Sequence, residues 1–320
     1  MPVRTLWVAN FDFEERLALE ESYLWHPDDA VVATLPAKFE VINRKHACKI
    51  VEVVSNDDSV VYPNAAGQLL NLDGSRFDAY HEETRLRFWG INRWAESVSE
   101  LFAKRTEDSL ASTARINARS WPIDSVCRLY CSFPPGLAIV RHHEGFEKAL
   151  VEIRRFGANG WAAKAEYGAS GRNALFRRGF EITAADRFWI DRQFMNFGFV
   201  VVEPLCDVRE EVSFHFSVLG NENFRFDGAV SFRCDRHGKF AGKTRVLKPP
   251  EIGPWEEQYD QAEYVAYAAD IPDYSGPLGV DVFRYRKPGG GDSYYVAHDV
   301  NARMTMGRLA LKKADPTFDL

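Results

Sequence analysis

The strongest constraint on the fold is a glycine run near the C-terminus that separates two strand-like segments. The segments are "GPLGVDVFRYR" (276–286) and "SYYVAHDVN" (293–301), and "KPGGGD" (287–292) lies between them. Because no helix follows the glycines, they predict a hairpin connection and not a phosphate loop. The two strands would then pair, and Asp281 and Asp299 would be neighbours across the ladder.

At the end of the second strand and just beyond it, polar residues stand at every second position, namely Asp299, Asn301 and Arg303. A period of two places these side chains on one face of an extended segment. Facing carboxylates repel unless a cation lies between them, and an amide oxygen completes an all-oxygen set that suits Mg²⁺ shared with nucleotide phosphates. Arg303 could then stabilise the charge of a transferred phosphoryl group. The alternative is a pair of exposed hairpin acids and a surface arginine.

Length and charge restrict the class of protein. A chain of 320 residues that is 46% hydrophobic predicts two or three lobes, because single cores stop growing at about 250 to 300 residues. A net charge of −6 without a block of like charges argues against a nucleic-acid partner and favours a small-molecule substrate. Because no segment reaches the roughly 18 apolar residues of a membrane span, we expect a soluble, cytoplasmic protein without a membrane partner.

The five cysteines are odd in number and form no CxxC pair, which argues against a disulfide framework or a zinc site. We expect most of them to be buried thiols. They are Cys48, Cys127, Cys131, Cys206 and Cys234.

The first hundred or so residues predict a small α/β domain. Three short apolar segments indicate strands: "TLWVANF" (5–11), "AVVATL" (30–35) and "KIVEVV" (49–54). Further along, apolar residues from Leu86 to Leu101 recur at roughly helical spacing, interrupted at Gly90. They include Trp89 and Trp94, and core packing is favoured over a ligand surface for this stripe.

From about Ile116 the pattern predicts the order strand, helix, strand, helix, strand, followed by a β-rich region. Gly157 is expected to end the first helix and Thr183 to begin the second. The successive segments are "LAIV" (137–140), "GFEKALVEIRRFG" (145–157), "GWAAKAE" (160–166), "TAADRFWIDRQFMNFG" (183–198), "FVVVEPL" (199–205), "EVSFHFSVL" (211–219), "NFRFDGAVSFRCD" (223–235), a hairpin turn at Gly238, and a helix over "EEQYDQAEYVAYAA" (256–269).

Two further segments carry weak signals for a nucleotide. In "KAEYGASGRN" (164–173), Lys164 precedes small residues whose backbone N–H groups could approach phosphate oxygens, although a plain turn fits as well. In "VVVEPLCDVREEVSF" (200–214), Glu203 ends an apolar strand at a possible adenine hinge, and Glu211 could accept from ribose hydroxyls. The alternative is that these glutamates are solvated loop acids.

Taken in chain order, these segments resemble the ATP-grasp superfamily of ATP-dependent carboxylate–amine (or thiol) ligases. Members carry a strand lysine before a small-residue loop, a glutamate at the adenine hinge, an acid on a late strand, and E-x-N or E-x-N-x-R on the next. The matches are Lys164 with "YGASGR", Glu203 in "VVVEPL", Asp281 in "GVDVF", and "DVNARMTMG" (299–307). The ending resembles a branch of the superfamily that reads N-x-R-x-T-M-G.

The resemblance covers about Ile116 to the C-terminus and implies an α/β (α+β) ATP-grasp fold. Residues 1–112 would be the preceding N-terminal α/β domain, and residues 113–320 the ATP-grasp domain. Within the latter, a mobile lid subdomain would span about 137–202 and the central catalytic lobe about 203–320. The substrate pocket would be built from the first domain and the central lobe. Five residues there are either pocket or structural residues, with a solvated or structural role favoured for the histidines: Trp89, Trp94, Arg141, His142 and His143.

The resemblance also implies a role for each matching residue. Many members have Glu where this chain has Asp299, whose shorter carboxylate would bridge two metal ions less well. The implied roles are: Lys164 on the α and β phosphates; Gly168, Ser170, Gly171 and Arg172 in the lid loop; Glu203 and the backbone near Leu205 on adenine; Glu211 or Glu210 on ribose; Asp281, Asp299 and Asn301 on Mg²⁺; Arg303 on the transferred phosphate or acyl phosphate; and Arg119 as a second phosphate-binding residue.

The implied reaction uses ATP and one or two Mg²⁺ ions, with Mn²⁺ as a substitute metal. A carboxylate attacks the γ-phosphate to give an acyl phosphate and ADP, and an amine then displaces phosphate. The expected partners are ATP, a small carboxylate and an amine, together with a second copy of the chain in a homodimer. Two alternatives stay open: a small-molecule kinase of the same fold, and a non-catalytic ATP-binding regulatory protein.

Overall fold

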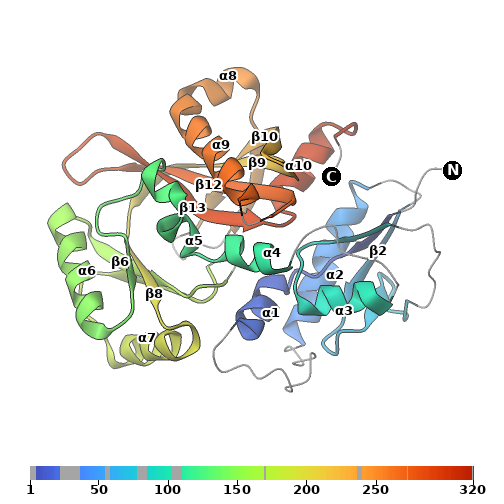
Figure 1. Cartoon of the computed structure of the whole chain (residues 1–320), viewed down its shortest axis with the longest axis horizontal. Helices are drawn as coiled ribbons and strands as arrows, with labels where there is room; N and C mark the ends of the chain where they lie inside the picture. The colour runs from blue at the N-terminus through green and yellow to red at the C-terminus, as the bar shows by residue number, and fades with distance from the viewer. Residues whose placement is uncertain are drawn as a thin grey trace.

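The computed structural model describes residues 5–21, 37–54, 58–77, 85–101, 110–168, 171–235, 240–271, 273–318 and 320. Within these ranges the chain forms three sheets with helices packed around them (Figure 1). The first sheet is formed by the N-terminal part of the chain, and the second carries helices α6 and α7. The third sheet, which includes the C-terminal strands, lies between the other two.

The first sheet has the strand order β3-β2-β1-β4, formed by Leu69–Asn71, Ser59–Pro63, Thr5–Val8 and Arg85–Phe88. β1 is parallel to β2 and β4. Alternate strand residues face opposite sides: Trp7 and Tyr62 pack with α2 (Lys38–Val51), and Val61 packs with α3 (Arg93–Leu101). Helix α1 (Phe13–Glu20) follows β1. The expected small α/β unit is therefore present.

Two sequence expectations in this region were wrong. Residues 49–51 of "KIVEVV" end helix α2, whose buried residues Phe39, Asn43, Ala47 and Ile50 recur at helical spacing. Leu86 lies on β4, since pairing with β1 overrides the helical spacing, and α3 begins only at Arg93. The segment "AVVATL" lies outside the described residues.

The second sheet is antiparallel, with the order β5-β8-β6-β7 formed by Ala138–Val140, Val200–Pro204, Gly160–Lys164 and Ala174–Arg178. Helix α6 (His143–Phe156) ends at left-handed Gly157 (φ 87°), and α7 (Ala184–Phe197) begins with a capping box between Thr183 and Asp186, as expected. Strand β7 was not predicted.

The third sheet is antiparallel, with the order β11-β10-β9-β12-β13. Its strands are Phe240–Val246, Asn223–Cys234, Asp207–Gly220, Gly276–Arg286 and Asp292–Ala302. One face packs on α9 (Glu256–Asp270) and α4 (Leu110–Asn117) through an apolar core that includes Phe214 and Phe216. The opposite face carries the alternate residues of β9, among them Glu211, Ser213 and His215. The turn expected at Gly238 lies outside the described residues.

The predicted hairpin between β12 and β13 is confirmed, and the register pairs Asp281 with Asp299. Helix α10 (Met306–Ala314) follows it, capped by the Thr305 side chain. Four short helical segments complete the described elements: α5 (Trp121–Asp124), η1 (Val126–Leu129), α8 (Pro249–Ile252) and η2 (Gly253–Trp255).

All five cysteines are free, but only Cys127 is buried and Cys48 is exposed, so the expectation of mostly buried thiols was wrong. In the part of the chain that the structure describes, no helix combines the length and apolar character needed to cross a membrane.

Candidate active site

A cavity of about 1010 Å³ is lined by residues of all three sheets. The predicted site residues line it, with two exceptions: Gly168 does not, and Ser170 lies outside the described residues. Pockets for a single small molecule have volumes of roughly 300 to 1,000 Å³. The cavity therefore lies at the upper end of this range.

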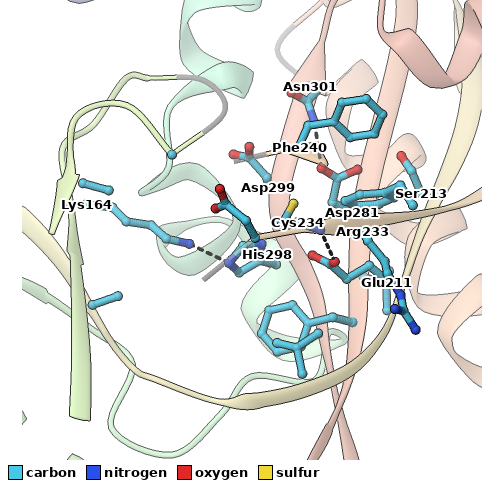
Figure 2. A pocket seen from close by; sticks show the side chains of 18 of the residues that line it. Lys164, Glu211, Ser213, Arg233, Cys234, Phe240, Asp281, His298, Asp299 and Asn301 are labelled. Atoms are coloured by element: carbon cyan, nitrogen blue, oxygen red, sulfur yellow. Dashed lines mark hydrogen bonds between the residues drawn. The ribbon is translucent and has the colours of Figure 1, made fainter. Parts of the chain in front are cut away.

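Asp281 and Asp299 face each other on neighbouring strands inside this cavity (Figure 2). Asp281 also bonds to Ser213 on β9, and its Oδ2 accepts from the Asn301 amide at 3.4 Å. Burial, reinforced by the charge of Asp299, raises the pKa of Asp281 to about 7, although Ser213 and Arg303 act in the opposite direction. This paired carboxylate would be stabilised by a cation.

Arg303 joins this group to the N-terminal part of the chain. Its Nη2 donates to Asn301 Oδ1 at 2.7 Å, and its Nε donates to Glu14 Oε1 at 2.8 Å. Glu14, in the first turn of α1, is only 8% exposed. The expectation that Asn301 and Arg303 share a face is met by their direct contact. The role of Glu14 was missed, because 289 residues separate it from Arg303.

Lys164 and Glu203 form a buried ion pair across the second sheet, with Nζ 2.8 Å from Oε1. His298 Nε2 lies 2.6 Å from the same Nζ, and the Tyr295 hydroxyl donates to Glu203 Oε2 at 3.3 Å. Burial alone would raise the pKa of Glu203, but Lys164 and His298 outweigh it and lower the pKa to about 2. Glu203 is therefore a buried anion and not a solvated loop acid.

His298 reaches the site because of an irregularity in β13. Strict alternation would point it away from the face that carries Asp299. The register shifts between Asp281 and Phe283, and Ala297 there has a left-handed backbone (φ 56°), so β13 bulges opposite β12. In Figure 2 the His298 ring points from this strand toward Lys164. The two-residue pattern in the sequence gave no sign of this bulge.

The loop after β6 is held from outside the second sheet. Arg119 Nη1 donates to the Ala165 carbonyl at 2.9 Å, and its Nη2 donates to the Gly168 carbonyl at 2.5 Å. Arg172, beyond left-handed Gly171 (φ 74°), forms an ion pair with Glu15 of α1. Arg119 thus lines the cavity but uses both terminal nitrogens to brace the loop that was expected to cover phosphates.

Close to Asp281, Glu211 Oε2 accepts from the backbone N–H of Cys234 at 2.6 Å. The neighbouring Glu210 is exposed and forms an ion pair with Arg284 at 3.1 Å. The backbone N–H of Leu205 donates to the Gly160 carbonyl at 3.0 Å. That N–H is engaged in the sheet, so a polar contact from the Leu205 backbone to a base would have to come from its carbonyl.

His215 is a deeply buried residue of the site that the sequence analysis missed. It is 1% exposed, its Nδ1 lies 3.5 Å from Thr305 Oγ1, and its Nε2 has no hydrogen-bond partner among the residues that the structure describes. Burial lowers its pKa to about 3, with a further contribution from Arg308. A Cβ on Gly307 would lie 2.1 Å from His215 Nε2. Because glycine has no Cβ, the start of α10 can lie directly against the His215 ring.

The donor set fits a magnesium ion that shares its coordination with a nucleotide. Among the residues that the structure describes, no group of three or more His, Cys, Asp or Glu side chains is placed to hold a metal ion alone. Mg²⁺ commonly takes only one or two carboxylates and completes its shell with phosphate and water oxygens. Asp281 and Asp299, with the amide of Asn301 beside them, correspond to that pattern.

No protein-family model matches the chain, and no curated protein matches it. Solved structures do resemble it. N5-carboxyaminoimidazole synthetase from Staphylococcus aureus, complexed with ADP, has a TM-score of 0.54 at 11% identity, covering 96% of this chain and 72% of that chain. D-alanine-D-alanine ligase from Coxiella burnetii has a TM-score of 0.50 at 14% identity, with coverages of 93% and 85%.

A third structure is the biotin carboxylase domain of 2-oxoglutarate carboxylase from Hydrogenobacter thermophilus, in complex with MgADP, ADP and bicarbonate. Its TM-score is 0.51 at 12% identity, covering 95% of this chain and 64% of that chain. At such low identities the likeness concerns the fold. The chain therefore has the ATP-grasp fold, which the order of its motifs predicted.

Proposed function

We propose that the chain is an ATP-dependent, Mg²⁺-dependent ligase that joins a small carboxylic acid to an amine (or thiol) through an acyl phosphate. The main support is one observation: the Asp281–Asp299 pair lines the same cavity as the buried Lys164–Glu203 pair. The proposal also draws on two structures of the same fold: the N5-carboxyaminoimidazole synthetase complexed with ADP, and the biotin carboxylase domain in complex with MgADP.

In this proposal the nucleotide lies between the second and third sheets. Lys164 exchanges part of its contact with Glu203 and His298 for the phosphate oxygens, which an ammonium with three donors can do. The loop that Arg119 braces covers the phosphates. Glu203 and the Leu205 carbonyl hold the base, and Glu211 holds the ribose, since its carboxylate faces the cavity.

At the reacting end, Asp281, Asp299 and Asn301 hold the metal, and Arg303 orients the substrate carboxylate and stabilises the charge on the transferred phosphoryl group. Mg²⁺, when bound there, supplies positive charge to the phosphate oxygens. The substrate carboxylate attacks the γ-phosphorus, the bond to ADP breaks, and the amine then attacks the acyl carbon and releases phosphate. Glu14 keeps the Arg303 guanidinium in place throughout.

The test is an ADP-release screen of the purified protein with Mg·ATP, carried out with panels of carboxylic acids and amines and followed by mass measurement. Ligation predicts ADP and phosphate in equal amounts and a product that has lost one water. A stable phosphorylated product would instead identify a kinase, and absence of ADP release with every pair would refute catalysis by this site.

Matched variants connect any activity to the proposed residues. Asp299→Asn and Asp281→Asn should abolish turnover, whereas Asp260→Asn, at an exposed position of α9, should leave it unchanged. Normal ADP release by either site variant would contradict the metal assignment. The mobile lid at 137–202, the division of the chain at 112/113, the homodimer, the substitution of Mn²⁺ and the cytoplasmic location stay predictions.

A further inference from the structure

Three stacked rings from the N-terminal part of the chain form one wall of the cavity. The Phe11 ring stacks on both His46 and Trp89, with ring centroids 4.0 and 3.7 Å apart and interplanar angles of 14° and 27°. All three residues line the cavity, together with Ile42 of α2 and Met306 of α10. We refer to Phe11, His46 and Trp89 as the aromatic wall.

The aromatic wall is attached directly to the strand end that carries the proposed reaction centre. The backbone N–H of Met304 donates to the Trp89 carbonyl at 2.9 Å, and Met304 follows Arg303 in the chain. The Trp89 N–H is itself held by Asn10 Oδ1 at 2.9 Å. Because these bonds fix Trp89 beside Arg303, a molecule whose carboxylate reaches Arg303 would lay its remaining atoms against the wall.

Among the described residues, the charged side chains that line the cavity beside the wall are already paired. Burial, with the nearby charges of Lys49, Lys45 and Arg172, lowers the pKa of His46 to about 4, so its ring is neutral near pH 7. Of the described residues that line the cavity, Glu14, Arg172 and Arg303 are charged and adjoin the wall, and each takes part in an ion pair. A second charged group on the ligand would therefore lose hydration without gaining a partner.

We propose that the aromatic wall binds the body of the carboxylic acid substrate, and that this body is a flat, uncharged aryl or heteroaryl ring. The inference rests on the proposed ligase function and adds the chemical class of one substrate to it. Planar rings gain offset or edge contacts with aromatic side chains beyond the burial of apolar area. A short aliphatic acid leaves the wall exposed to water, and a dicarboxylate places a charge against it.

The experiment measures the dissociation constants of four probe acids by calorimetry with the full-length protein, in the absence and presence of Mg·ADP. Phenylacetate and indole-3-acetate carry rings, acetate lacks one, and glutarate has a second charge. We expect the two ring acids to bind at least about tenfold more tightly than acetate, as one favourable ring contact implies. Glutarate should bind no more tightly than acetate.

Variants of the wall separate ring recognition from general damage. Phe11→Leu and His46→Leu each remove a half-buried ring and should reduce the preference for ring acids to about threefold or less, with binding of Mg·ADP unchanged. Val41→Ala changes a 69% exposed residue of α2 next to Ile42 and should keep the full preference. Melting temperatures show that each variant is folded.

The outcomes for the two proposals are distinct. Equal binding of phenylacetate and acetate, tighter binding of glutarate, or binding of none of the four acids to a protein that binds Mg·ADP would overturn the aromatic-acid inference. Failure to bind Mg·ADP would overturn the proposed ligase function. In that case the titrations without nucleotide still decide whether the wall prefers rings.

Discussion

Asp281→Asn should make the ligand-free protein more stable while removing its activity. The pKa of this buried carboxyl rises from an ordinary value of 3.8 to about 7, chiefly through burial and then through Asp299. At about 1.4 kcal/mol for each pH unit between these values, keeping the charge in the folded protein costs up to about 4 kcal/mol at pH 8. An asparagine has the same shape and carries no charge, so it avoids that cost.

The sign of the pH dependence follows from the direction of the shift. The folded protein binds this proton more tightly than the unfolded chain does, so the stability of the wild type falls as pH rises from 3.8 to about 7. The advantage of Asp281→Asn over the wild type should therefore be small at pH 4 and full at pH 8. Asp260→Asn, at an exposed position, should show no such trend.

Urea unfolding followed by tryptophan fluorescence at pH 4, 6 and 8 measures these differences. Mg·ADP should narrow the difference at pH 8 from about 4 to about 1 kcal/mol, because a ligand present at about 100 times its dissociation constant stabilises the wild type by about 2.7 kcal/mol. The variant should gain much less. An advantage that does not change between pH 4 and pH 8, or a variant less stable than the wild type at pH 8, would refute the reasoning.

Three further predictions concern the partners of the site. Glu14→Gln should lower the rate of ADP release about tenfold or more without changing the affinity for Mg·ADP, since Arg303 loses its buried carboxylate; steady-state kinetics and nucleotide titration measure the two effects. Lys164→Met should cost about 3 kcal/mol of unfolding free energy and weaken Mg·ADP binding, because the Glu203 carboxylate stays buried without its lysine. The control Lys148→Met, at a 73% exposed side chain, should change neither quantity. Because the pKa of Glu203 is lowered to about 2, its charged form stabilises the fold above pH 4.5. As the pH falls to about 2, the wild type should lose about 3 kcal/mol of unfolding free energy that Glu203→Gln does not lose. The urea midpoint, measured across this pH range, tests the difference.

The elements that could be predicted from sequence have local causes. Gly157 and Thr183 mark helix ends by their own backbone or side-chain chemistry, and the glycine run at 287–292 connects two alternating strands. Strand β7 was missed, because its residues are half-buried or exposed and show no clear alternation. Leu86 was misplaced, because pairing with a distant strand decided its conformation.

The residues of the candidate site also fall into those that a local sequence pattern predicts and those that depend on distant parts of the chain. The hairpin register brought Asp281 and Asp299 together as the sequence indicated, since an antiparallel ladder converts spacing along the chain into neighbours in space. His298 was missed, because a bulge at Ala297 changes the direction of the strand. Glu14 was missed for a different reason. Its contact with Arg303 depends on how two distant parts of the chain pack, which no local pattern records.

One apolar cluster joins the beginning of the chain to its end. Trp7, Tyr62 and Trp89 of the first sheet region pack in a single core with Met304 and Leu309. During synthesis on the ribosome, the first sheet emerges long before Met304 and Leu309 have been added to the chain. The interior of the first sheet is therefore incomplete until Met304 and helix α10 have been made, and the aromatic wall takes its final arrangement only when the strand end that it adjoins is present.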